Sequence, residues 1–287
     1  MSLVQLDTGT PAPQANAARI DADAVRRELE AKIEGEVRFD TITRALYSTD
    51  ASVYQIQPLG VVIVKNRQDI IAALEICHRF RCPLTMRGGG TSQGGQSIGH
   101  GVQIDISKYY NRILEVNAEE RWVRVEPGIV LDELNAQLAP LGLRFAPDIS
   151  TASRATIGGM MANNSSGARS VLYGKTIDHV LEQVVALSDA SIVHFRDIPP
   201  SQVPSGDSLE AACYRTVLRL ANEHAAEIDR RYPKILSLSH PRHSRGRFAH
   251  RRCRLLFLAP LRLGRKAHRK RHHRPRRFHQ HHRRSCF

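Results

Sequence analysis

The chain of 287 residues lacks several features that mark common classes of protein. Its five cysteines are odd in number and irregularly spaced, and no Cys-x-x-Cys pair occurs, which argues against a disulfide framework, a metal ribbon or an iron–sulfur cluster. No apolar run approaches the ~20 residues of a membrane span, and the first residues lack the layout of a signal peptide. We therefore expect a cytoplasmic protein without a metal, with peripheral association with the inner membrane as an alternative.

Acidic residues are absent from His240 to the end, where seventeen Arg and Lys and nine of the fourteen His gather. The first 239 residues hold 25 basic and 28 acidic residues, so the formal net charge of +14 belongs to the last segment. Its apolar content is too small to offset the entropy of ordering a chain of like charges. We therefore expect residues 237–287 to form a disordered basic tail.

Three explanations of this tail are open. A composition rich in Arg, His and Pro after an abrupt join is typical of a GC-rich gene translated in a shifted frame, which would leave the tail without a function. A second explanation is an arm for nucleic acid or an anionic membrane, since Lys/Arg runs bind phosphate without sequence preference. Weak metal binding by the histidines is the third. The second explanation gives the alternative function, a non-enzymatic basic protein that binds nucleic acid through its tail.

A loop in the first third of the chain holds five of the nineteen glycines and follows a strand-like run. Because glycine has no Cβ, consecutive N–H groups in such a loop can turn toward one ligand, usually a phosphate. No Lys lies between Lys65 and Lys108, which excludes a Walker loop, and Gln93 breaks the dinucleotide pattern G-x-G-x-x-G. The loop is expected to bind phosphate in another way, the alternative being a mobile surface turn.

Hydrophobic periodicity predicts an α+β chain. Strands are expected at residues 61–64, 83–86, 101–106 (half-buried), 113–116, 122–126 and 180–187, and helices at 21–33, 69–80, 130–138 and 208–228. The last helix is expected to present an inner face of Leu209, Ala212, Val217, Leu220 and Ala221. The strand, helix and strand before the glycine loop indicate a βαβ unit, and ligands of open α/β sheets bind at the carboxyl ends of such strands.

A second glycine-rich segment spans residues 147–167, with Pro147-Asp148-Ile149-Ser150 first and the glycines in residues 156–167. Small residues at 158, 159, 162 and 167, together with Thr and Asn, suit a backbone that passes closely over a flat, polar ligand. The alternative is a tightly packed start of a helix. Two such segments in one domain favour the ligand.

Taken in order, five motifs resemble the FAD-binding (PCMH-type) domain of the vanillyl-alcohol oxidase and p-cresol methylhydroxylase flavoprotein superfamily. They are Pro58-Leu59-Gly60-Val61-Val62, Arg87-Gly88-Gly89-Gly90-Thr91-Ser92, Val125-Glu126-Pro127-Gly128, Pro147-Asp148 with Thr156-Ile157-Gly158-Gly159 and Asn163, and Tyr173-Gly174. The chain is most similar to bacterial FAD-linked dehydrogenases of the D-lactate and glycolate type. The resemblance covers roughly residues 54–195.

This resemblance implies a two-subdomain fold, with a small βαβ subdomain and a larger mixed-sheet subdomain. We expect a disordered lead-in over residues 1–20, a helical segment over 21–53 and the FAD-binding domain over 54–236. The family's domain then continues into a large cap domain that supplies substrate-binding and catalytic groups, and the run after Leu236 departs from that pattern. The resemblance therefore implies a truncated chain whose activity without a cap domain is in doubt.

The resemblance also assigns residues to the cofactor. Arg87, Gly88, Gly89, Gly90, Thr91 and Ser92 would bind the FAD pyrophosphate through backbone N–H groups. Pro147, Asp148 and Ser150 would flank the flavin, while Thr156, Gly158, Gly159, Ala162, Asn163 and Gly167 would line the ribityl and isoalloxazine path and Val180 the adenine end. Thr91 stands where some members carry the His that links the flavin covalently, so the FAD is expected to be non-covalent.

The implied activity is oxidation of a D-2-hydroxy acid by hydride transfer to flavin N5, with an iron–sulfur module of long relatives as the electron acceptor. No general base can be assigned, and His179 is expected to be a packing residue. One departure is local, because relatives have Ala-Asp-Gly after the strand at 180–187 and this chain has Ser188-Asp189-Ala190. A glycine there would suit a hairpin turn with positive φ.

Overall fold

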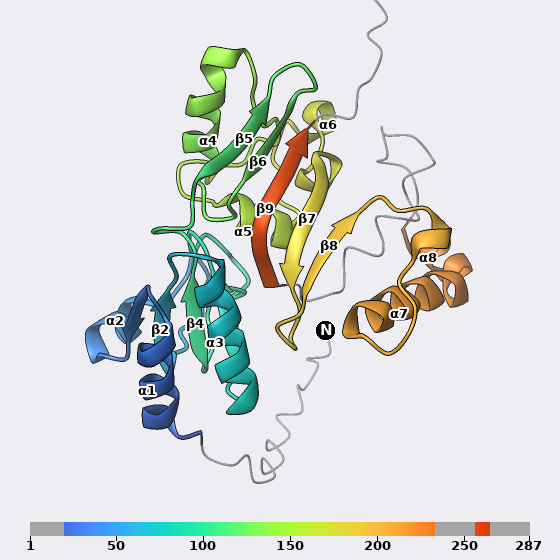
Figure 1. The fold of residues 1–287 in the computed structure, drawn as a ribbon. Helices are drawn as coiled ribbons and strands as arrows, with labels where there is room; N and C mark the ends of the chain where they lie inside the picture. The colour runs from blue at the N-terminus through green and yellow to red at the C-terminus, as the bar shows by residue number, and fades with distance from the viewer. Residues whose placement is uncertain (1–19, 233–255, 265–287) are drawn as a thin grey trace, which may run out of the picture.

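The computed structural model describes residues 20–232 and 256–264, which form two subdomains side by side (Figure 1). Each subdomain has its own β-sheet with helices packed on it. The α+β class with a smaller and a larger subdomain, predicted from the sequence, is confirmed. The expected lead-in lies outside the described residues except for Ile20.

The small subdomain is a four-stranded sheet with the strand order β1-β2-β4-β3. Its elements are α1 (Ala22–Lys32), β1 (Glu36–Arg38), α2 (Thr41–Leu46), β2 (Gly60–Ile63), α3 (Arg67–Arg79), β3 (Leu84–Arg87) and β4 (Val102–Asp105). Strands β2, β4 and β3 run parallel, and β1 pairs with β2 in the antiparallel sense. The predicted βαβ unit is present with β4 between its two strands, and β1 is a strand that the sequence did not predict.

Helix α3 joins the two strands of the βαβ unit and packs on the sheet (Figure 1). Asn66 caps its N-terminus by accepting a hydrogen bond from the amide of Asp69. Its apolar stripe, which includes Ile70 and Cys77, is buried in a core shared with α1 and the sheet. Ala186 from the second sheet belongs to the same core. This shared core fixes the two subdomains against each other.

Strand β4 is buried on both faces, whereas the sequence predicted a half-buried strand. It lies between β2 and β3, so its polar residues have internal partners. The side-chain amide of Gln103 donates to the carbonyl oxygen of Tyr47 at 2.9 Å, and Asp105 accepts the Tyr47 hydroxyl at 2.6 Å. The alternation in the sequence therefore reflects internal hydrogen bonding and not exposure to water.

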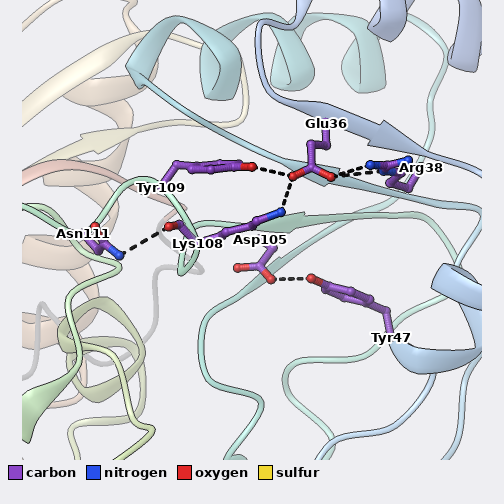
Figure 2. Close-up of polar contacts among 7 residues, drawn as sticks. All are labelled: Glu36, Arg38, Tyr47, Asp105, Lys108, Tyr109 and Asn111. Carbon is purple, nitrogen blue, oxygen red and sulfur yellow. Dashed lines mark hydrogen bonds and ion pairs between the residues drawn. The ribbon is translucent and has the colours of Figure 1, made fainter.

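At the outer edge of this sheet, Glu36 on β1 collects three partners (Figure 2). Its carboxylate accepts hydrogen bonds from Lys108 at 2.5 Å, from the Tyr109 hydroxyl at 2.7 Å and from Arg38 at 2.7 Å. These bonds, that of Lys108 first, lower the pKa of Glu36 from 4.5 to about 2. The cluster ties β1 to the chain that follows β4.

The large subdomain is a five-stranded antiparallel sheet with the order β5-β6-β9-β7-β8. Its strands are β5 (Ile113–Asn117), β6 (Trp122–Val125), β7 (Val180–Ala186), β8 (Ile192–Arg196) and β9 (Leu256–Gly264). Its helices are α4 (Leu131–Leu138), α5 (Ile157–Asn163), α6 (Ser170–Tyr173), α7 (Leu209–Glu223) and α8 (Ala225–Arg231), with 3-10 turns at Ala139–Leu141, Thr176–Asp178 and Pro200–Gln202. The predicted hairpin is β5 and β6, and its core packs against α4 and α5.

Strand β9 belongs to the segment that was expected to be a disordered tail. It pairs with β6 on one side and β7 on the other, near the middle of the large sheet (Figure 1). The apolar residues of the tail concentrate here, and the alternation Leu261-Arg262-Leu263 suits a strand. Within the expected tail, the structure describes only residues 256–264, and the rest lies outside the described residues.

The long helix predicted over residues 208–228 is two helices, because His224 leaves the helical range with φ −107° between α7 and α8. Ala211 is the buried residue of α7, while Leu209 and Cys213 pack on the core beneath β7 and β8. The predicted inner face of α7 is thus half-buried. The turn after β7 was expected to need a positive φ where relatives carry glycine. Ala190, at that position, has φ 65°.

Candidate functional site

The glycine-rich loop begins directly after β3, at the carboxyl end of a parallel strand as predicted. A Cβ atom on Gly88 would lie 2.1 Å from Oγ1 of Thr156, and one on Gly89 would lie 2.1 Å from the carbonyl oxygen of Arg154. Gly90 has φ 62°, a left-handed conformation that favours glycine. The first two glycines are therefore required because the second glycine-rich segment lies against them, and not only because a ligand approaches the loop.

The second glycine-rich segment makes equally close contacts with other predicted motifs. A Cβ atom on Gly167 would lie 1.6 Å from the carbonyl oxygen of Asp148, and one on Gly158 would lie 2.7 Å from Cβ of Pro127. Residues that are far apart in the sequence thus pack backbone against backbone. Three of the five motifs that carry the family resemblance therefore form one contiguous unit.

A cavity of about 340 Å³ opens where this unit meets the segment before β2. It is lined by Thr49, Asp50, Ala51, Arg87, Gly89, Gly90, Thr91 and Arg154. Its volume lies within the range of small-molecule sites. Because two guanidinium groups and one carboxylate line it, its charge favours an anion.

The guanidinium of Arg87 is fixed beneath the loop by its surroundings. It lies over the ring of Tyr47, 5.0 Å from the centroid, and donates to the carbonyl oxygens of Tyr47 and Ser97 at 3.4 Å each. The Tyr47 hydroxyl in turn donates to Asp105 (Figure 2). Burial, followed by the charge of Asp105, raises the pKa of Tyr47, which therefore stays protonated. This chain of contacts holds Arg87 at the wall of the cavity.

The segment before β2 was not predicted to belong to the site, because the expected domain boundary lies at residue 54. The amide of Ala51 donates to the carbonyl oxygen of Gly90 at 3.0 Å, and the hydroxyl of Ser97 donates to Asp50 at 3.0 Å. These bonds join residues 49–51 to the glycine loop. The polar run of small residues from Thr49 to Ser52 is the signal that was available in the sequence.

Arg154 is the second residue that sequence reasoning missed. It is exposed, it lines the cavity, and its backbone lies against Gly89. An arginine within a segment of small residues between Ser150 and Gly159 was the available signal. The second glycine-rich segment thus contributes a cation, Arg154, to the same cavity that Arg87 and the glycine loop line.

The remaining predicted residues do not line this cavity, and most of them lie along α5 and its approaches. Gly159, Ala162 and Asn163 share one exposed face of α5, and Ser150 is also exposed. Pro147 and Thr156 are buried, and Ser92 is half-buried in the loop. Asp148 pairs with Arg169 at 2.7 Å, which lowers the pKa of its carboxyl, while Val180 begins β7 and packs on the core of α4 and α5.

His179, which was expected to be a packing residue, is buried. Its Nε2 lies 2.7 Å from the carbonyl oxygen of Tyr173, and its ring meets that of Phe145 edge-on with centroids 5.6 Å apart. Across residues 20–232 and 256–264, no group of three or more His, Cys, Asp or Glu is placed to hold a metal ion. In that same part of the chain, no helix is long and apolar enough to cross a membrane.

Comparison with known proteins identifies this unit. The FAD binding domain family matches residues 58–196, which hold both glycine-rich segments. The solved structure of p-cresol methylhydroxylase with substrate bound has the same fold, with a TM-score of 0.56 and 16% identity over 66% of this chain and 40% of that chain. Residues 58–196 therefore match the FAD binding domain family and share the fold of p-cresol methylhydroxylase, and the match supports FAD as the cofactor.

Curated relatives extend the match on both sides of this domain. D-2-hydroxyglutarate dehydrogenase from Pseudomonas putida is 39% identical over 258 residues, covering 83% of this chain and 25% of that protein. The protein of that name from Escherichia coli is 37% identical over 216 residues, covering 73% and 21%. Glycolate oxidase subunit GlcD from Bacillus subtilis is 34% identical over 166 residues, covering 56% and 35%. The chain thus spans about a fifth to a third of the length of these relatives.

The residues of the cavity suit the pyrophosphate of FAD. The loop after β3 would offer backbone N–H groups, and Arg87 and Arg154, which line the cavity, are cations of the kind that phosphates require. No histidine stands in the Arg87–Ser92 loop. The exposed face of Gly159, Ala162 and Asn163 has the small residues that a flat ring requires for close approach.

Proposed function

We propose that this chain is the FAD-binding part of an oxidoreductase that acts on a D-2-hydroxy acid. Two kinds of relative support the substrate class, since one is named for D-2-hydroxyglutarate and the other for glycolate. Both molecules carry a hydroxyl on the carbon next to a carboxylate.

The observation that carries the proposal is the cavity between the two glycine-rich segments. In it, the backbone of Gly89 to Thr91 and the guanidinium of Arg154 would bind the cofactor's pyrophosphate, with Arg87 fixing the loop from below. Asp50 would not repel the phosphates strongly, because its carboxylate accepts hydrogen bonds from the Ser97 hydroxyl and the Ser52 amide. The exposed face of α5 would then receive the flavin end.

The chemistry of 2-hydroxy acid oxidation divides between cofactor and protein. FAD, when bound, supplies the acceptor for the hydride that leaves the substrate carbon. The protein must remove the hydroxyl proton and neutralise the carboxylate. We assign neither task to a described residue, and His179 is unsuitable as a base because it is buried against Phe145.

The cofactor half of this proposal is tested with the purified chain and added FAD. Quenching of flavin fluorescence on titration should give saturable one-to-one binding, and acid precipitation should release all of the flavin to the supernatant because Thr91 replaces the linking histidine. A folded chain that leaves FAD fluorescence unchanged would refute the cofactor site. Flavin that stays with the precipitate would refute the non-covalent attachment.

The substrate half is tested by anaerobic mixing of the FAD-loaded chain with D-2-hydroxyglutarate, D-lactate or glycolate. Loss of the visible flavin absorbance with D-2-hydroxyglutarate and D-lactate, and not with their L-enantiomers, is the expected result, and achiral glycolate should also bleach the flavin. If FAD binds and no 2-hydroxy acid bleaches it, the substrate assignment to this chain fails while the cofactor site stands.

A further inference from the structure

Two cysteines of the small subdomain lie at the turn between α3 and β3. Cys77 is in the last turn of α3, and Cys82 stands two residues before β3. Both side chains belong to the buried core, with 2% and 6% of their surface exposed. They lie at the end of β3 opposite the glycine loop, so their chemistry is separate from the cofactor site.

The turn that joins them has the backbone of a Schellman motif. The amide of Cys82 donates to the carbonyl oxygen of Cys77 at 2.8 Å, and the amide of Arg81 donates to that of His78 at 3.1 Å. Arg81 itself has φ 50°, the left-handed conformation that this motif requires. In such a motif the side chains at the positions of Cys77 and Cys82 meet each other.

The hydrogen bond between the two residues limits how far apart they can be. Standard bond lengths, together with the trigonal angle at the carbonyl carbon of Cys77, keep the two Cα atoms on either side of the 2.8 Å N···O contact within about 6.7 Å of each other. Disulfides span Cα separations of about 4.4–6.8 Å. The native backbone therefore already satisfies the distance requirement for a disulfide.

The two thiols also differ in acidity. A hydrogen bond from the Cys77 thiol, with help from the amide of Val102, lowers the pKa of Cys82 to about 7, while the pKa of Cys77 is raised. Cys82, which stands outside the helix and is the more exposed of the two thiols, would react first, and Cys77 would resolve the product.

We propose that Cys77 and Cys82 form a redox-active pair that a hydroperoxide converts into an intramolecular disulfide. The Cys82 thiolate attacks the O–O bond, which breaks to give a sulfenic acid on Cys82 and one water or alcohol. The Cys77 thiol then attacks that sulfur, the S–O bond breaks, and a second water leaves as the S–S bond forms. Two thiols lose two electrons and two protons, and the peroxide is reduced by the same two electrons.

Trypsin provides a direct assay, because it cleaves between the two cysteines. The chain is treated with hydrogen peroxide in its folded state, blocked with N-ethylmaleimide and digested. Peptides Gln68–Arg79 and Cys82–Arg87 each contain one cysteine and should be recovered joined, with or without an oxygen on Met86. Dithiothreitol should separate them. Recovery of the two peptides apart, each carrying maleimide, would overturn the proposal, as would crosslinks of either cysteine to Cys213, Cys253 or Cys286.

Two serine variants provide controls. Cys213→Ser should leave the joined peptide unchanged, and Cys77→Ser should abolish it. Because the disulfide would close a short ring without moving the backbone, oxidation should raise the melting temperature of the wild-type chain by about 5 °C and leave that of Cys77→Ser unshifted. A joined peptide accompanied by a fall in melting temperature would show that the bond distorts the turn, and the proposal of a preformed pair would fail.

Discussion

The carbonyl oxygen of Arg154 lies 2.1 Å from the point that a Cβ atom on Gly89 would occupy. The two glycine-rich segments are therefore in backbone contact, and this contact forms one corner of the cavity that we propose for FAD. Sequence reasoning assigned both segments to the cofactor and did not predict that they depend on each other.

This contact predicts the effect of a single methyl group on Gly89. Gly89→Ala should lower the free energy of unfolding by about 2 kcal/mol and weaken FAD binding at least ~10-fold, because backbone cannot yield as a flexible side chain does. Gly94→Ala in the same loop is the matched control, since its Cβ would meet only the mobile side chain of Gln96. Urea unfolding and flavin titration measure the two effects. Equal behaviour of the two variants would contradict the prediction.

Arg154 is expected to contribute charge to the cofactor site without contributing to the core. Arg154→Ala should weaken FAD binding ~10-fold, the value of one hydrogen bond to a charged group, and leave the melting temperature unchanged because the side chain is exposed. Arg219→Ala on α7, which removes an exposed pair with Glu223, is the control and should bind FAD normally. An unchanged dissociation constant for Arg154→Ala would remove this residue from the site.

The turn between β7 and β8 should gain stability from a glycine. Ala190 has φ 65°, so Ala190→Gly should raise the free energy of unfolding by about 1 kcal/mol by relieving the left-handed conformation. Ala186 in the adjoining strand is fully buried, so Ala186→Gly should lower the free energy of unfolding. Chemical denaturation of both variants provides the test, and a destabilised Ala190→Gly would contradict it.

Glu36 should make the free energy of unfolding depend on pH. Its pKa is lowered from 4.5 to about 2 by Lys108, Tyr109 and Arg38, so its contribution is fully present above pH 4.5 and is lost as pH falls toward 2. The difference in unfolding free energy between wild type and Glu36→Gln should therefore shrink over that window. Glu119→Gln, an exposed change in the turn after β5, should show no such trend. A difference that stays constant from pH 5 to pH 2 would contradict the assignment.

Local patterns were sufficient for much of the fold. The hydrophobic periodicity of α3 and the apolar runs of β2 and β7 place these elements within two residues of their observed bounds. Local patterns did not predict the break at His224, because the residues on both sides of it favour a helix. The change of direction there depends on how the chain packs.

The sequence by itself determined helices α1, α3 and α4, strands β2 to β7, the βαβ unit and the two glycine-rich segments, because each follows from spacing within a few neighbouring residues. Tertiary structure decided which surfaces meet. Only packing brings Asp50 and Arg154 to the same cavity from segments a hundred residues apart, buries Asp105 behind Tyr47, and inserts residues 256–264 between β6 and β7. Such long-range contacts depend on how whole elements fit together, and no local pattern encodes them.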